Sequence, residues 1–270
     1  MRTNTMTDTA TELVTLPLLK DNYGFILHDA VSNSTALIDV PDHAPLVAEL
    51  EKRGWPLTDI WITHHHWDHI DGLGPLLDAC AANGWTPRVV AARADMHRLP
   101  ADLITDQMDD GDTFMFGDIP VHILDVPGHT VGHIAYHLPS INTLFTADSL
   151  MALGCGRLFE GTPAQMWDTL QKLRALPPQT TVCSGHEYTQ SNGAFAITID
   201  PDNAALKDRI ANIATARAQN LPTVPSLLQL EIDTNPFLRA DNTALKAAIG
   251  MTDSSDLEVF TEIRARKDRF

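Results

Sequence analysis

Short runs in which apolar and polar residues alternate fill the first two thirds of the chain, and this alternation is typical of β-strands. In the segment 57–63, Ile60 and Ile62 lie two positions apart and would share one face of a strand. Longer segments between these runs favour helices. We predict strands over 12–18, 23–28, 35–39, 57–63, 88–91, 113–116, 120–126, 133–138, 142–147 and 181–184, and helices over 43–53, 73–83 and 163–175.

Beyond Tyr188 the alternation fades and helical signals take over. The segment 201–220 is rich in alanine, 242–249 has a helix-favouring composition, and Ser255 is a suitable N-cap for a last helix. We therefore divide the chain into a larger domain of mixed strands and helices, residues 1–187, and a smaller helical domain, residues 188–270. The predicted fold class is α+β.

The segment 63–72, Thr-His-His-His-Trp-Asp-His-Ile-Asp-Gly, follows a predicted strand and contains four histidines and an aspartate between His64 and His69. Imidazole binds Zn²⁺ and other borderline divalent ions, and a carboxylate adds an oxygen ligand or a base. His64, His66 and Asp68 alternate and would face one side of an extended chain, whereas His69 needs a turn to face the same cavity. This spacing predicts a site for two ions rather than one.

Three more predicted strands end in residues of the same type. The residues are His129, Asp148 and His186, and in two cases a glycine precedes the histidine and allows the backbone to turn sharply. Ligands that lie along one rim of a sheet can converge on a single cleft. We assign His65, which lies between two ligands and would point to the opposite side, to shaping the loop.

Composition excludes several classes of function. The 270 residues carry a formal net charge of −16, which argues against a broad cationic surface for nucleic acid or anionic membranes. Three widely spaced cysteines without a Cys-x-x-Cys pair indicate neither a disulfide framework nor a thiolate metal site. No stretch approaches the roughly 20 apolar residues of a membrane span, and no apolar signal segment follows Met1 or Met6, either of which could be the true start. We expect a soluble cytoplasmic protein.

Five longer motifs carry a resemblance to a known family. They are Thr63-His-His-His-Trp-Asp-His69, Gly154-Cys-Gly-Arg-Leu-Phe-Glu-Gly161, Gly185-His-Glu-Tyr-Thr189, Thr234-Asn-Pro-Phe-Leu-Arg239 and Arg264-Ala-Arg-Lys-Asp-Arg-Phe270. Together they resemble the hydroxyacylglutathione hydrolases, or glyoxalase II family, of the metallo-β-lactamase superfamily. The resemblance implies an αββα sandwich with a smaller C-terminal α-helical domain, with catalysis in residues 1–187 and substrate binding in residues 188–270.

The resemblance also implies which residues bind metal. It assigns His64, His66 and His129 to one divalent ion, Asp68, His69 and His186 to a second, and Asp148 to both. Zn²⁺ is our first choice, with Fe or Mn as alternatives, and two such ions lower the pKa of a bridging water toward neutrality. The implied reaction is attack of that hydroxide on S-D-lactoylglutathione, which gives D-lactate and glutathione in the second step of methylglyoxal detoxification. Asp68 is the implied catalytic residue, which orients the hydroxide and takes its proton. Asp39 either orients a ligand imidazole or caps a turn.

Substrate binding is implied for five further residues, which are Arg157, Phe159, Tyr188, Arg264 and Lys267. The chain departs from the commonest family pattern at Arg157, Phe159 and Asp71, where Lys, Tyr and Gly are frequent. The partner is therefore a small glutathione thioester, and we expect a monomer. Three alternatives stay open: a glutathione-persulfide dioxygenase with one iron, a metal-dependent nuclease or phosphodiesterase, and a metal-binding scaffold without activity.

Overall fold

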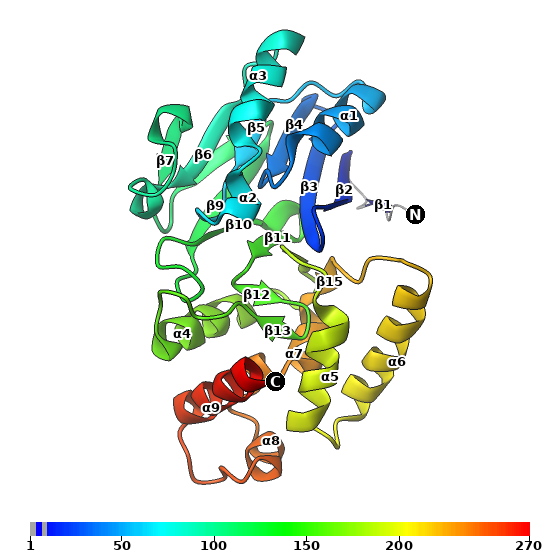
Figure 1. The fold of residues 1–270 in the computed structure, drawn as a ribbon, viewed down its shortest axis with the longest axis vertical. Helices are drawn as coiled ribbons and strands as arrows, with labels where there is room; N and C mark the ends of the chain where they lie inside the picture. Colours follow the sequence, from blue (N-terminus) through cyan, green and yellow to red (C-terminus); the bar gives the residue numbers. More distant parts are fainter. Residues whose placement is uncertain (1–3, 7–9) are drawn as a thin grey trace. The chain divides into compact units, whose positions relative to one another are not determined.

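The computed structural model describes residues 4–6 and 10–270 (Figure 1). These residues form two compact units. The first, here the N-terminal unit, contains the described residues up to Asp125 together with Gly132–Phe145. The second, here the C-terminal unit, contains Val126–Val131 and Thr146–Phe270. Strand β11, Thr143–Ala147, begins in the first and ends in the second.

The N-terminal unit begins with a sheet whose strands follow the order of the chain. Seven strands of the described residues form it: β1 Asn4–Met6, β2 Thr11–Leu18, β3 Asn22–Asp29, β4 Ser34–Ile38, β5 Asp59–Trp61, β6 Arg88–Ala92 and β7 Asp106–Met108. The pairs from β1 to β4 are antiparallel, and those from β4 to β7 are parallel. Parallel neighbours need crossover connections. These contain α1 His43–Arg53, α2 Trp67–Ile70, α3 Leu73–Asn83 and the 3₁₀ turns Arg93–Asp95 and Ala101–Leu103.

A second sheet of the same unit packs against the first. Its strands β8 Thr113–Phe116, β9 Ile119–Asp125, β10 Ile134–Leu138 and the start of β11 are antiparallel neighbours, with a 3₁₀ turn at Pro139–Ile141. Trp61 of the first sheet lies 5.3 Å from Tyr136 and 5.4 Å from both Phe114 and Phe116, measured between ring centroids. On the other face of the first sheet, α1 and α3 bury Leu46, Leu50 and Leu76 and similar side chains. The unit is therefore layered as helices, sheet and sheet.

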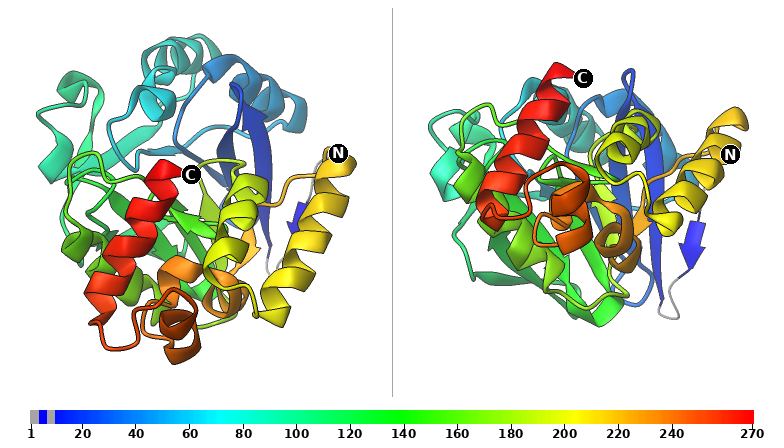
Figure 2. Two further views of the ribbon diagram at one scale, coloured as in Figure 1. Left: turned by 60° about the horizontal axis from the view of Figure 1, so that its bottom comes forward. Right: turned by 90° about the horizontal axis from the view of Figure 1, so that it is seen from below.

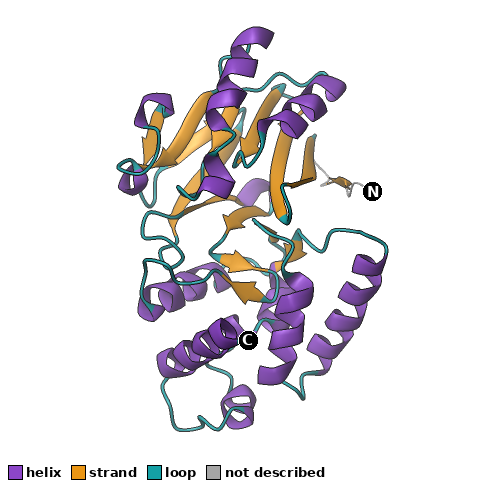
Figure 3. Cartoon of the chain, viewed as in Figure 1, coloured by secondary structure: helices purple, strands orange, loops and turns teal. Residues whose placement is uncertain are grey.

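The C-terminal unit is mainly helical (Figure 3). Its strands are the end of β11, β12 Leu150–Met151, β13 Gly154–Cys155, β14 Thr181–Ser184 and β15 Ser226–Leu227. Its helices are α4 Pro163–Arg174, α5 Thr189–Ile199, α6 Ala204–Ala218, α7 Leu228–Thr234, α8 Thr243–Ala248 and α9 Asp256–Arg269, with a 3₁₀ turn at Pro236–Leu238. Helices α5 and α6 lie side by side, and α9 packs on α4 (Figures 1 and 2).

Most predicted elements are confirmed, and their ends have identifiable causes. The last helix begins at Asp256 because Ser255 and Glu258 form a reciprocal capping box. The helix predicted over 201–220 is shorter, since Asn203 caps its start and it ends at Ala218. The segment 57–63 is a strand only over Asp59–Trp61.

The prediction missed α5, α7 and several short strands. Helix α5 buries Asn192, Phe195, Ala196 and Ile199, among others, and its sequence lacks the polar face that marks a surface helix. Strands β12, β13 and β15 have two residues each, too few to show an alternation. No helix among residues 4–6 and 10–270 is both long and apolar enough to span a lipid bilayer.

Candidate metal centre

The histidine-rich loop leaves the carboxyl end of β5 and turns into the short helix α2. His66 is extended, with φ −62° and ψ 142°, and the His69 N–H donates to the His66 carbonyl at 2.9 Å. This turn brings His69 back toward the preceding ligands, as its spacing predicted. His64 and His69 are buried, whereas His66 and Asp68 are partly exposed. Four of the predicted ligands are therefore together in the N-terminal unit.

The distances within this loop fit metal binding. His64 Nε2 lies 3.2 Å from His66 Nδ1. Two nitrogens bound tetrahedrally to one Zn²⁺ at about 2.0–2.1 Å lie roughly 3.3 Å apart, so this spacing suits two ligands of one ion. His69 Nε2 lies 4.0 Å from Asp68 Oδ2, which points to a second position. Asn22 Nδ2 donates to this Oδ2 at 3.2 Å and to the Asp68 carbonyl at 3.0 Å, and it holds the carboxylate in place.

Asp39 anchors the histidine-rich loop through hydrogen bonds at both of its ends. Its Oδ2 accepts hydrogen bonds from His69 Nδ1 and from Thr63 Oγ1, both at 2.8 Å, and its Oδ1 accepts from the Thr63 N–H at 2.8 Å. Because Nδ1 of His69 donates to Asp39, Nε2 is the nitrogen that can bind metal. Asp39 therefore orients the imidazole of His69, a predicted ligand, and this was one of its two predicted roles. Its φ of 59° places a non-glycine residue in the left-handed region, a strain of about 1–3 kcal/mol that clusters at functional sites.

The other three predicted ligands lie together in the C-terminal unit. His129 Nε2 is 3.4 Å from Asp148 Oδ2, and His186 Nε2 is 3.3 Å from the same oxygen. Both separations match those of two ligand atoms bound to one ion, so Asp148 Oδ2 lies close enough to share an ion with either histidine. All three side chains are buried, and Ala147, directly before Asp148, has a positive φ of 40°. This half of the site is thus also preformed and strained.

Neighbouring groups orient the two imidazoles of this half. His129 Nδ1 donates to the Arg157 carbonyl at 2.8 Å, which leaves Nε2 for Asp148 and metal. The His186 ring stacks on Tyr188 with centroids 4.7 Å apart and planes within 5°. Gly156 is required here because a Cβ would lie 1.9 Å from the Asp148 carbonyl oxygen and 2.9 Å from His129 Nδ1. The donor set of both halves, imidazole and carboxylate, suits a borderline divalent ion such as Zn²⁺, Fe²⁺ or Mn²⁺.

The five predicted substrate residues also lie in the C-terminal unit. The Phe159 ring is 62% exposed and 5.4 Å from the His129 ring, and the Arg157 guanidinium lies 5.9 Å from the Phe159 ring. Tyr188 is the residue that stacks on His186. Phe159 and Tyr188, the two aromatic residues predicted to bind substrate, therefore each adjoin the imidazole of a predicted ligand.

The two predicted cations on α9 have different surroundings. Arg264 is buried, and it donates to the Cys155 carbonyl at 3.1 Å and to Asp268 at 2.9 Å. Lys267 Nζ lies 5.3 Å from the rings of both Phe195 and Phe270. Burial lowers the pKa of Lys267, and the charge of Arg264 lowers it further. The Arg264 guanidinium thus already makes hydrogen bonds within the protein. Substrate binding by Arg264 or Lys267 stays a prediction.

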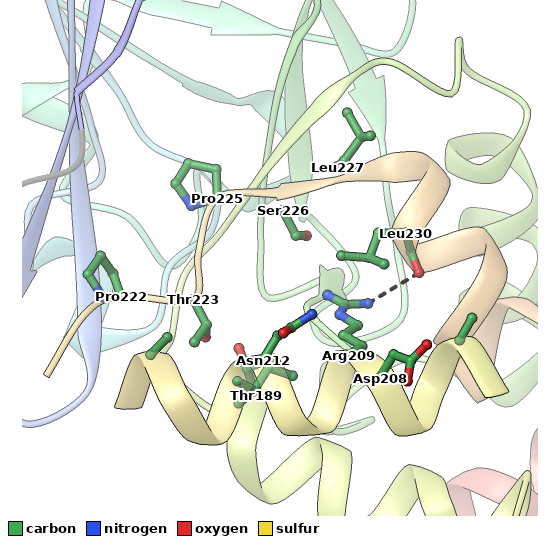
Figure 4. A pocket seen from close by; sticks show the side chains of 13 residues that line it. Thr189, Asp208, Arg209, Asn212, Pro222, Thr223, Pro225, Ser226, Leu227 and Leu230 are labelled. Atoms are coloured by element: carbon green, nitrogen blue, oxygen red, sulfur yellow. Dashed lines mark hydrogen bonds between the residues drawn. The ribbon is translucent and has the colours of Figure 1, made fainter. Parts of the chain in front are cut away.

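A cleft of about 510 Å³ in the C-terminal unit contains none of the predicted ligands (Figure 4). It lies between one face of α6 and the segment Pro222–Leu230, and Arg209 at its base donates to the Leu230 carbonyl at 3.3 Å. Thr223 on its wall donates through Oγ1 to Glu187 at 2.6 Å and through its N–H at 2.9 Å. Glu187 directly follows His186, a predicted ligand, so this wall helps to fix the chain at that histidine. Sequence reasoning missed this role because the two residues are far apart in the chain.

Comparisons with known proteins agree with the motifs. A family model described as the metallo-beta-lactamase superfamily matches residues 23–186, and one described as the hydroxyacylglutathione hydrolase C-terminus matches residues 187–270. A hydroxyacylglutathione hydrolase of Ruegeria pomeroyi is 58% identical over 260 residues, which cover 96% of this chain and 99% of that protein. Another, of Jannaschia sp., is 54% identical and covers 96% of this chain and 98% of its own.

Solved structures with lower identity share the fold. ETHE1 from Myxococcus xanthus has a TM-score of 0.63 at 21% identity and covers 99% of this chain and 91% of its own. The B3 metallo-beta-lactamase BLEG-1 has a TM-score of 0.60 at 20% identity and covers 83% of this chain and 98% of its own. The predicted metallo-β-lactamase fold with a helical C-terminal part is therefore confirmed.

Proposed function

The chain belongs to the hydroxyacylglutathione hydrolase family of the metallo-β-lactamase superfamily, and from this membership we propose that it hydrolyses S-D-lactoylglutathione to D-lactate and glutathione. It is a thioester hydrolase that acts in the second step of methylglyoxal detoxification. The observation that carries the reaction class is the position of Asp148 Oδ2, within 3.4 Å of both His129 and His186. An oxygen shared in this way is what a centre with two ions requires.

The ligand assignment that we propose joins the two halves of the site. His64, His66 and His129 hold one ion, Asp68, His69 and His186 hold the second, and Asp148 binds both. The separations of 3.2 Å between His64 and His66 and of 3.3 Å between His186 and Asp148 support this assignment. Zn²⁺ is the proposed metal, with Fe²⁺ or Mn²⁺ as alternatives for the same donors. When bound, such ions supply a water of near-neutral pKa and a Lewis acid for the thioester carbonyl.

The side chains of the protein complete the reaction. Asp68, held by Asn22 and still partly exposed, orients the attacking water and accepts its proton. The Asp39 carboxylate keeps His69 in the tautomer that binds through Nε2. The leaving group is the thiolate of glutathione, whose conjugate thiol has a pKa of about 8.5, so expulsion requires no dedicated general acid. This agrees with a site made of ligands and one carboxylate base.

We propose that residues 188–270, with Arg157 and Phe159, bind the glutathione part of the substrate, and that residues 1–187 carry out catalysis. Phe159 and Tyr188 adjoin ligand imidazoles and offer apolar contact next to the reacting bond. The half-buried Lys267 and the more exposed Arg157 supply the positive charge that a peptide carboxylate needs on a protein of net charge −16. Arg264 acts with them or supports the loop at Cys155.

We also propose that the protein works as a monomer in the cytoplasm. Cys80, Cys155 and Cys183 are all free and buried, which suits a reducing compartment. Size-exclusion chromatography with light scattering at micromolar concentration tests the oligomeric state, and a mass near twice 29.6 kDa would contradict a monomer.

One experiment separates the proposed activity from its alternatives. Purified protein is assayed for metal by elemental analysis and for cleavage of S-D-lactoylglutathione through release of free thiol. We expect thiol release by a protein with about two ions per chain. One iron per chain with oxygen consumption on glutathione persulfide would replace our proposal by a dioxygenase. Cleavage of a phosphodiester without thiol release would replace it by a phosphodiesterase.

A further inference from the structure

We infer that Asp95 and Arg98 are positioning residues for the metal-binding loop, and that they act by holding His65. The inference rests on the proposed metal centre. It concerns a side chain that lies between two ligands, His64 and His66, and that none of the ligand assignments uses. All five residues belong to the N-terminal unit.

Both ring nitrogens of His65 are engaged. Nδ1 lies 2.9 Å and 3.0 Å from the two carboxylate oxygens of Asp95, and Nε2 lies 3.0 Å from Arg98 NH1. A guanidinium has only N–H donors, so His65 Nε2 accepts from Arg98 and Nδ1 carries the proton that it donates to Asp95. The His65 ring is thereby fixed in one tautomer and one orientation. His65 therefore holds the loop in place through Asp95 and Arg98, and it does not bind metal.

The pairing of strands in the sheet places Asp95 next to the loop that contains His65. Strands β5 and β6 are parallel neighbours, so the segments that follow their carboxyl ends lie next to each other. The loop with His65 follows β5, and the 3₁₀ turn Arg93–Asp95 follows β6. Asp95 is 1% exposed, and a buried carboxylate is maintained only with partners such as this imidazole.

A second ligand-bearing segment also approaches Asp95. A Cβ added to Gly132, three residues after His129, would lie 2.5 Å from Asp95 Oδ1. The next residue, His133, stacks on His64 with ring centroids 4.6 Å apart and planes within 11°. Asp95 therefore lies against two segments, the loop at His65 and the chain at Gly132, and the residue after Gly132 stacks on His64. Loss of its carboxylate frees the loop around His65, and the ligands must then be ordered at the moment of metal binding.

The test is a double-mutant cycle on metal affinity. Wild type, Asp95→Ala, His65→Ala and the double variant are stripped of metal, and Zn²⁺ affinity is measured by competition with a chromophoric chelator. We expect each single variant to weaken binding by about 10- to 100-fold, as is usual when a group that orients a ligand is lost. The double variant should be no weaker than the worse single variant, because Asp95 acts through His65. Full additivity would mean that Asp95 acts by another route.

Two further variants keep the test decisive. Asp102→Ala removes an exposed carboxylate a few residues away and should bind Zn²⁺ as wild type does. Arg98→Met keeps the apolar stem, lies on the surface, and should weaken binding by about threefold through loss of one hydrogen bond. If Asp95→Ala does not fold by far-ultraviolet circular dichroism, His65→Ala and Arg98→Met decide, and unchanged affinity in both overturns the inference.

A spectroscopic readout separates positioning from general destabilisation. With Co²⁺ in place of Zn²⁺, Asp95→Ala should show altered visible bands at full occupancy, and excess metal should restore most of its thioester hydrolysis. An unaltered spectrum with lower affinity would point to a purely structural role and reject the inference. If the wild type binds two ions but cleaves no glutathione thioester, the proposed function is wrong. The comparison of Zn²⁺ affinities between wild type and variants would still test the role of Asp95.

Discussion

The two groups of proposed metal ligands, one in each unit, are built in different ways. Four proposed ligands of the N-terminal unit come from one loop between His64 and His69. The three proposed ligands of the C-terminal unit, His129, Asp148 and His186, follow the ends of three different strands. The first half is specified by local sequence and one turn. The second exists only when strands far apart in the chain have paired in register.

The supporting contacts differ in the same sense. Carboxylates support the N-terminal half, since Asp39 fixes His69 and Asp95 fixes His65. In the C-terminal half, support comes from a backbone carbonyl on His129 and an aromatic ring on His186. Asp148, itself a predicted ligand, lies within 3.4 Å of both histidines. Substitutions in the first half should therefore lower metal affinity, whereas loss of Asp148 should remove the shared site itself.

The largest effect is expected for Asp148→Ala. This substitution removes the oxygen that lies within 3.4 Å of two histidines, so we expect turnover to fall by about 10³-fold or more and metal content to fall below two ions per chain. Turnover by thiol release and metal by elemental analysis are measured on the same sample. The exposed Asp118→Ala is the control. Full activity with full metal content in Asp148→Ala would disprove the bridging role.

A smaller effect is expected for Asp39→Ala in the other half. Three donors lose their acceptor, so Zn²⁺ affinity should fall by about 10- to 100-fold and the free energy of unfolding by about 1–3 kcal/mol. Chelator competition and urea unfolding of the metal-free protein measure the two quantities. Asp78→Ala, on the exposed face of α3, should change neither. Unchanged affinity would mean that the loop keeps its shape without this anchor.

The contrast between the halves also explains what the sequence could predict. The spacing of His64, His66, Asp68 and His69 is a local pattern and revealed its chemistry directly. His129 and His186 were found because a glycine and a predicted strand precede each of them. Asp95 and Asn22 were missed, since their contacts with His65 and Asp68 span 30 and 46 positions and leave no periodic signal. For the fold, long amphipathic segments were predicted well. The two-residue strands β12, β13 and β15 were missed, and so was α5, which lacks a polar face.

Lys267→Ala tests whether substrate binding belongs to the C-terminal unit. Loss of the cation should raise KM for S-D-lactoylglutathione by about tenfold, the loss expected for one hydrogen bond to a charged group, and leave metal content unchanged. Lys207→Ala, an exposed lysine on α6, is the matched control. KM, kcat and metal content are measured together for both variants. An unchanged KM would mean that Lys267 does not bind the substrate and is only a cation near the end of α9.

The smallest effect concerns stability at high pH and asks whether the two units unfold together. Burial raises the pKa of Cys155 in the C-terminal unit, and of Cys80 in the N-terminal unit, from 9.0 to about 11. A raised thiol pKa in the folded state means that the unfolded chain loses its proton first, so stability is fully present below pH 9 and falls as pH rises toward 11. Each such thiol contributes a slope of at most about 1.4 kcal/mol per pH unit.

Urea unfolding between pH 8 and pH 10.5 measures these slopes in Cys155→Ser and Cys80→Ser. If the protein unfolds in one transition, each variant should flatten the same slope by at most about 1.4 kcal/mol per pH unit. If the units unfold separately, Cys155→Ser should flatten only the transition of the C-terminal unit and Cys80→Ser only that of the N-terminal unit. A slope that neither variant changes would mean that these thiols titrate alike in both states. Separate transitions would extend the contrast between the two halves of the metal centre from their construction to their stability.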